Sequence, residues 1–72
     1  MTAEEFGRLR AGDCLRLDGT DKIYFINQVR GPGFYICCFA DPKTLDPDRT
    51  TGFVPVRSPD RLALIPRKDP RR

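Results

Sequence analysis

Ile23-Tyr-Phe-Ile26 and Phe34-Tyr-Ile-Cys-Cys-Phe39, joined through Gly31-Pro-Gly33, decide the fold of this 72-residue chain. Both apolar runs are rich in aromatic and β-branched residues, which favour strands. Two glycines around the fixed φ of a proline favour a tight reversal. The sequence therefore predicts a β-hairpin with strands over residues 22–30 and 34–40.

Shorter strands are expected on both sides of the hairpin. Leu15 and Leu17 alternate with Arg16, which predicts a strand over residues 13–17 with the leucines facing inward. Residues 52–56 and 62–65 form two further short apolar runs, and Pro55 places the first of them near a sheet edge. The polar stretch 41–51 between them and the hairpin is predicted to be a long loop.

Two short helical segments complete the predicted elements. Thr2 and Glu5 have the spacing of a capping box, which predicts one or two helical turns over residues 3–10. Ser58 can cap a turn that starts with Pro59, so a single helical or 3₁₀ turn is expected over residues 58–61.

This order of elements resembles that of SH3-like barrels. Gly12-Asp-Cys-Leu-Arg-Leu17 is similar to their opening strand, and residues 52–65 are similar to their closing strand, helical turn and final strand. The resemblance covers residues 12–66. It implies an all-β fold, a five-stranded SH3-like barrel with a short N-terminal helical turn and a 3₁₀ turn before the last strand. We expect one domain over residues 1–66 and a basic tail over 67–72. A small barrel implies no particular activity.

The net charge of +3 belongs to the tail. Residues 67–72 hold four basic side chains against Asp69, and the rest of the chain is neutral. No apolar run approaches the length of a membrane span, and the acidic N-terminus lacks the apolar core of a secretory signal. We therefore expect a cytoplasmic protein that does not contact membranes.

The side chains that carry most enzyme chemistry are scarce. The chain has no histidine, which excludes nucleophiles paired with histidine, and its three cysteines are too few for a four-ligand zinc site. Asp41, Asp46 and Asp48 lack the glycine and glutamate of a calcium loop. We expect no catalytic residue, metal, cofactor or small-molecule substrate, and we expect the cysteines to pack as reduced, small apolar side chains.

The hairpin has more apolar residues than one buried face needs. A strand with one face in water alternates, whereas an uninterrupted apolar run indicates that both faces are covered. If Arg30 lies opposite Phe34 and Val29 opposite Tyr35, one face becomes the core: Ile23, Phe25, Val29, Tyr35, Cys37 and Phe39. The other face then holds Tyr24, Ile26, Phe34, Ile36 and Cys38, with Gln28 and Arg30 at its margin.

Two coverings of this second face are open. The N-terminal turn can lay Phe6 and Leu9 on it, or a partner can bind it. Our first hypothesis is a non-enzymatic protein-interaction module that binds a protein partner or a second copy of itself, because aromatic residues beside an arginine are typical of interface hot spots. Its predicted contact residues are Tyr24, Ile26, Arg30, Phe34 and Ile36.

The alternative hypothesis is an accessory RNA- or DNA-binding barrel. Strand aromatics beside basic residues can stack nucleobases and hold phosphates. The neutral body makes this less favoured, because four tail charges give weak and salt-sensitive binding. Its predicted contact residues are Tyr24, Arg30, Phe34, Arg67, Lys68, Arg71 and Arg72.

Overall fold

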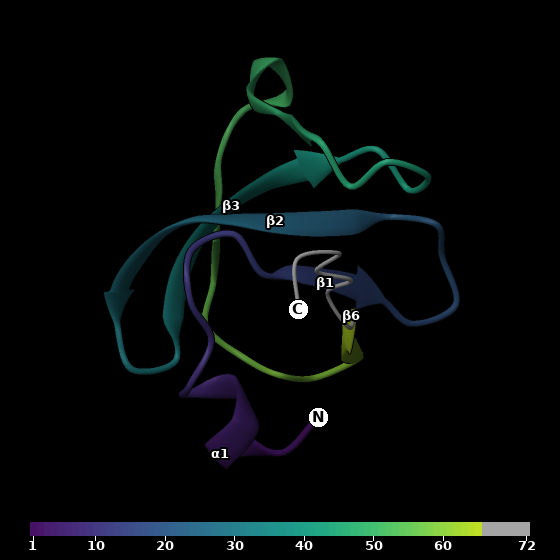
Figure 1. The fold of residues 1–72 in the computed structure, drawn as a ribbon. Helices are drawn as coiled ribbons and strands as arrows, with labels where there is room; N and C mark the ends of the chain where they lie inside the picture. The colour runs from purple at the N-terminus through teal and green to yellow at the C-terminus, as the bar shows by residue number, and fades with distance from the viewer. Residues whose placement is uncertain (66–72) are drawn as a thin grey trace, which may run out of the picture.

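The computed structural model describes residues 1–65 of the chain. An antiparallel sheet forms the body of the protein (Figure 1). The predicted tail residues Arg67, Lys68, Arg71 and Arg72 lie outside the described residues. One helical turn, α1 (Ala3–Phe6), precedes the sheet. The strands are β1 (Cys14–Leu17), β2 (Ile23–Gly31), β3 (Phe34–Ala40), β4 (Pro47–Asp48), β5 (Val54–Val56) and β6 (Leu62–Ile65).

The strands follow the order β4-β3-β2-β1-β6, and β5 also pairs with β3. β4 pairs with the end of β3 and β5 with its beginning, so the two share one edge, with the 3₁₀ turn η1 (Arg49–Thr51) between them. The all-β prediction is confirmed, and the five predicted strands are present. β4 and η1 were missed inside the expected loop. No ladder joins β5 to β6 in the described part of the chain, so closure into a barrel remains a prediction.

Strand β2 carries two bulges, at Asn27 and at Arg30. Val29 lies opposite Tyr35 as predicted, but Gly31, not Arg30, lies opposite Phe34. Each bulge adds one residue to β2. Because side chains alternate along a strand, one extra residue moves the side chains on its far side to the opposite face of the sheet. The predicted faces of β2 before Asn27 are therefore wrong, while the faces of β3 are as predicted.

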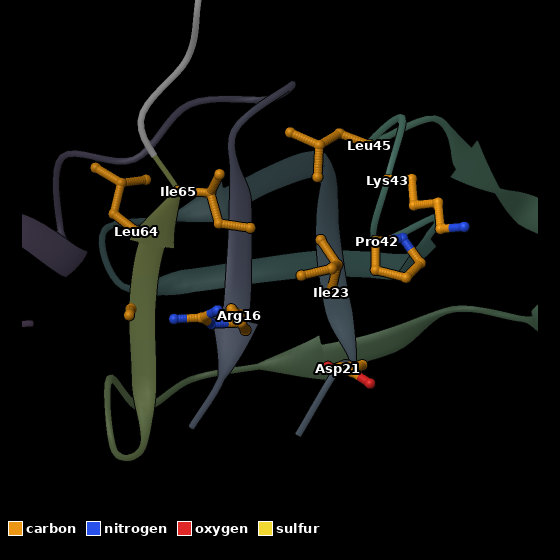
Figure 2. A pocket seen from close by; sticks show the side chains of 9 residues that line it. Arg16, Asp21, Ile23, Pro42, Lys43, Leu45, Leu64 and Ile65 are labelled. Atoms are coloured by element: carbon orange, nitrogen blue, oxygen red, sulfur yellow. The ribbon is translucent and has the colours of Figure 1, made fainter. Parts of the chain in front are cut away.

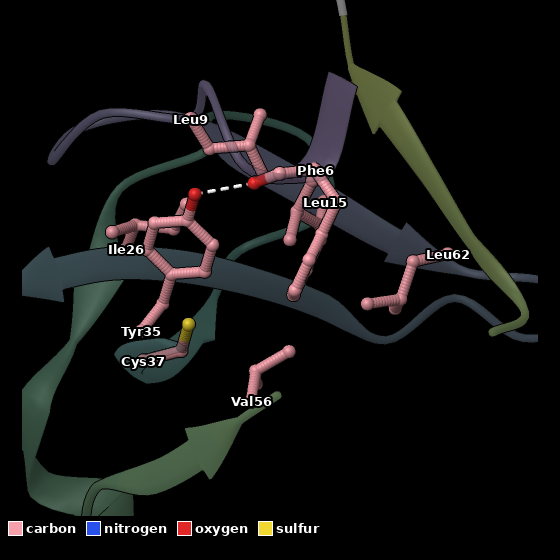
Figure 3. Packing of buried hydrophobic residues seen from close by; sticks show 8 residues of the cluster. All are labelled: Phe6, Leu9, Leu15, Ile26, Tyr35, Cys37, Val56 and Leu62. Atoms are coloured by element: carbon pink, nitrogen blue, oxygen red, sulfur yellow. Dashed lines mark hydrogen bonds between the residues drawn. The ribbon is translucent and has the colours of Figure 1, made fainter. Parts of the chain in front are cut away.

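The inner face of the sheet packs into the main core, which Figure 3 shows. Ile26 pairs with Cys37 across β2 and β3, and Tyr35 is also fully buried there. Val29, predicted to be a core residue, is 44% exposed because it lies beyond the strand β1. The buried cluster consists of Phe6, Leu9, Leu15, Ile26, Tyr35, Cys37, Val56 and Leu62.

The N-terminal segment closes this inner face. The hydroxyl of Tyr35 donates a hydrogen bond to the carbonyl oxygen of Phe6, and the two rings meet edge to face at 5.1 Å between centroids. Gly33, at φ +71°, brings the hairpin turn up to the Phe6 ring. The predicted capping box forms, with the amide of Glu5 donating to the Thr2 hydroxyl. The helix is a single turn and shorter than the predicted range 3–10.

The predicted helical turn at residues 58–61 is wrong. The segment makes one hydrogen-bonded reversal, in which the amide of Leu62 donates to the carbonyl of Pro59. Arg61 has φ +59°, outside the helical region, so the turn cannot continue as a helix. Ser58 still acts as expected at its start, since its hydroxyl accepts from the amide of Asp60 at 3.2 Å. Among the described residues, no helix has the length and apolar character to cross a bilayer.

Candidate functional site

The predicted contact residues do not share one face. Tyr24 and Ile26 lie on the inner face, and Ile26 is fully buried in the main core. Phe34 and Ile36 alternate with the buried Tyr35 and Cys37 and so lie on the opposite, outer face. Arg30 is exposed at a bulge near the hairpin tip. The single extra residue at Asn27 is the reason, because it moves Tyr24 and Ile26 to the core side.

The outer face has its own apolar surface, arranged in rows across the paired strands. The register places the outer residues of β2 beside those of β3: Phe25 pairs with Cys38, and Gln28 pairs with Ile36. Pro55 of β5 flanks Ile36 on its other side. By alternation from Val54 and Val56, Phe53 and Arg57 continue this face before and after β5. The two-sided apolar hairpin predicted from the sequence is therefore present, with different members.

One end of the outer face is covered by the chain itself. Ile23 and Ala40 are buried there with Cys14, and Leu45 from the loop after β3 packs against them with Ile65. A groove of about 410 Å³ lies between this loop and β6, as Figure 2 shows. Its rim carries charges of both signs, from Arg16, Asp21 and Lys43.

The other end of the outer face is open. A hollow of about 360 Å³ lies over Ile36 and Gln28, between Asn27, Arg49 and Phe53. Phe53 is 55% exposed, the most exposed large apolar side chain among the described residues. The hollow is lined by Asn27, Gln28, Ile36, Arg49 and Phe53. We call the open end these five residues together with Phe34 and Arg57, which are in contact with each other, and Phe25, which lies beside Arg49 and also packs against the covered end.

Two arginines of the open end lie over phenylalanine rings, one of them at a larger distance. The guanidinium of Arg57 lies 4.3 Å above the centroid of Phe34, and that of Arg49 lies 6.0 Å from the centroid of Phe25. Nε of Arg49 also donates to Oδ1 of Asn27 at 2.9 Å. Within residues 1–65 the one ion pair joins Arg8 to Glu4, so neither guanidinium has a carboxylate counter-ion there. Both are held in place with donors left for an external anion.

Sequence reasoning missed Arg49, Phe53 and Arg57. Two of them carried a usable signal, because Phe53, Pro55 and Arg57 alternate with the inward valines of β5. Arg49 carried none, since its place beside Phe25 depends on how η1 returns to the sheet.

The cysteines are buried, as predicted, and do not resemble reactive thiols. Burial, reinforced by the neighbouring Cys38, raises the pKa of Cys37 to about 12, so its thiol stays protonated at neutral pH. Residues 1–65 also contain no group of three cysteine, aspartate or glutamate side chains placed to hold a metal ion.

No protein-family model, curated protein or solved structure matches this chain.

Proposed function

We propose that this chain is a non-enzymatic protein-interaction module and that its contact surface is the open end of the outer face. The observation that carries the proposal is the difference in covering between the two sides of one hairpin. Phe6 and Leu9 close the inner side. On the outer side, Phe34 and Ile36 remain half-buried and Phe53 exposed, with no further described segment over them.

The composition of this surface supports a protein partner. Phenylalanine and arginine are enriched in interface cores, and arginine is among the commonest hot-spot residues. A partner protein or a second copy of the chain would bury Phe53 and Ile36 between the two arginines. The proposal keeps Phe34 and Ile36 from the residues predicted from the sequence and adds Phe25, Arg49, Phe53 and Arg57.

We also propose that the sheet belongs to the SH3-like barrels. The order of its elements supports this, with the strands 14–17, 23–31, 34–40, 54–56 and 62–65 matching the five expected ones. The additional β4 lies on the same edge of β3 as β5, so it adds no new layer.

The experiment compares two exposed apolar side chains that differ in face. Phe53→Ser removes one from the open end, and Val29→Ser removes one of similar exposure, 44%, from outside it. Affinity purification of tagged protein from its source cells identifies proteins that bind the wild type. Sedimentation equilibrium at several concentrations measures self-association.

We expect Phe53→Ser to lose the partner or the self-association and Val29→Ser to keep it. Both variants change exposed positions, so their circular dichroism spectra should match that of the wild type. If partner recovery and oligomeric state are the same in all three proteins, the open end is not the contact surface.

A further inference from the structure

We propose that the open end binds an extended acidic segment of its partner, with two carboxylate side chains four residues apart and an apolar side chain midway between them. This inference rests on the proposed function and states what the partner must carry.

The spacing comes from the register of the sheet. Arg57 follows Val56, the partner of Tyr35, so it lies level with Phe34, and its guanidinium sits over that ring. Arg49 lies over Phe25, which pairs with Cys38. Phe34 and Cys38 are four residues apart on β3, which corresponds to about 13 Å at a rise of about 3.3 Å per residue.

An extended peptide has the same period. Its residues i, i+2 and i+4 point to one side, and the first and last of these are also about 13 Å apart. A carboxylate at each of these two positions can therefore reach Arg57 and Arg49. The residue midway between them lies over Ile36, which is midway between Phe34 and Cys38.

The two arginines are suited to receive carboxylates. The guanidinium of Arg57 lies on the Phe34 ring. That of Arg49 is held through Nε by Asn27, with the Phe25 ring at 6.0 Å, which leaves the terminal nitrogens of its fork for a ligand. A prearranged fork loses little side-chain freedom when it binds. Both lack a carboxylate partner within the described residues, so an acidic segment would supply one.

The middle of the open end is suited to an apolar side chain. Ile36 forms the floor of the hollow, and Phe53 and Gln28 stand beside it. A leucine-sized side chain placed there would cover Ile36 and part of the exposed Phe53 ring. With an apolar contact between two charge contacts, the surface recognises the spacing of the side chains along the peptide as well as their charge.

An acidic peptide fits better than a single-stranded nucleic acid. Base stacking needs free aromatic faces, but a guanidinium already lies over Phe25 and another over Phe34. Phe53 alone is left as a platform. The chain before the tail is also neutral, so it offers little general attraction for phosphates.

The test titrates ¹⁵N-labelled full-length protein with synthetic peptides up to millimolar concentration and follows amide shifts. The probe peptide has the core Glu-Thr-Leu-Thr-Glu. Matched peptides replace both glutamates with glutamine, or move one glutamate to the position next to leucine. A ten-nucleotide oligo(dT) is titrated separately at 150 mM salt. The protein variants are Arg49→Gln, Arg57→Gln, Phe53→Ser and, as a control of equal charge change away from the sheet, Arg8→Gln.

We expect the probe peptide to shift the amide signals of Gln28, Ile36 and Phe53. Arg49→Gln and Arg57→Gln should each weaken the affinity for the probe about fivefold, which is the upper range for an exposed ion pair. Arg8→Gln should bind as the wild type does, and the glutamine and respaced peptides should bind more weakly than the probe. The spectrum of each protein variant without peptide shows whether that variant is folded.

Each of four results would overturn the inference. If no peptide binds, or if the glutamine peptide binds as well as the probe, the acidic motif is wrong. If oligo(dT) binds more tightly than the probe and loses binding in the same arginine variants, the ligand is a nucleic acid. If peptides bind independently of both arginines but fail to bind Phe53→Ser, the motif fails and the protein-interaction surface stands.

Discussion

The inner and outer faces of the hairpin are built from the same two strands and contain similar side chains, yet they end in different environments. Ile26 and Tyr35 on the inner face are fully buried, whereas Ile36 and Phe34 on the outer face are half-buried. The difference lies in the segments that cover them. Phe6 and Leu9 of the N-terminal segment pack on the centre of the inner face, around Tyr35 and Ile26. The loop bearing Leu45 covers only one end of the outer face.

The comparison separates two roles for apolar residues in a small domain. A chain of this size has a limited core, so each fully buried side chain contributes strongly to its stability. Side chains of the open end contribute less to folding and leave apolar area that a partner can cover. Substitutions on the inner face should therefore change the free energy of unfolding, and those at the open end should change binding.

The largest expected effect tests this separation with two isoleucines on neighbouring strands. Ile26→Ala should reduce the free energy of unfolding by about 2–5 kcal/mol, because it leaves a cavity in the main core. Ile36→Ala should cost about 1 kcal/mol, since its side chain is half-buried and leaves no enclosed cavity. Urea unfolding followed by circular dichroism measures both.

If Ile26→Ala does not fold, Ile26→Val replaces it, with an expected cost of about 0.5–1.5 kcal/mol. Ile36→Val is then the matched control and should be close to neutral. Equal costs at the two positions would contradict the separation of the faces.

The extent of sequence-based prediction follows the same division. The strands 34–40 and 62–65 were predicted with the observed bounds, because local apolar runs and turn residues determine them. The way the faces of the two hairpin strands combine was not predicted. The bulge at Asn27 adds one residue to β2 and exchanges its faces, and no local signal in the sequence marks that bulge. Arg49 joins the open end only through the path of the chain after β4, and a path set by distant contacts has no signature in nearby residues.

A second prediction uses the pH dependence of the inner face. Cys37 ionises with a pKa near its ordinary value of 9.0 in the unfolded chain and of about 12 in the fold, because burial disfavours the thiolate. Between these two values the folded state binds more protons than the unfolded state. The thiol's contribution to stability is therefore complete below pH 9 and is lost as the pH rises toward 12, by up to about 1.4 kcal/mol per pH unit.

The measurement is the free energy of unfolding of the wild type and of Cys37→Ala at several pH values from 7 to 11. Tyrosine and lysine ionise in the same range, but they do so in both proteins, so the difference between the two curves isolates the thiol. The wild type should lose stability more steeply than Cys37→Ala above pH 9. Parallel curves would mean that the inner face is open enough for water to solvate the thiolate.

The smallest expected effect concerns the covering of the inner face. Tyr35→Phe removes the hydroxyl that donates to the Phe6 carbonyl and leaves that oxygen without this donor, at a cost of about 1–2 kcal/mol. Tyr24→Phe is the matched control, because the hydroxyl of Tyr24 has no hydrogen-bond partner in residues 1–65. The half-buried Tyr24 ring stacks on that of Phe39, with 5.4 Å between the ring centroids. The free energy of unfolding of Tyr24→Phe should stay within about 0.5 kcal/mol of that of the wild type.

Amide exchange of Phe6 and Gly7 should quicken only in Tyr35→Phe, and the acidic probe peptide should bind both variants as it binds the wild type. Altered peptide binding in Tyr35→Phe would mean that the covering of one face is coupled to the ligand of the other, since the two faces share the backbone of β3.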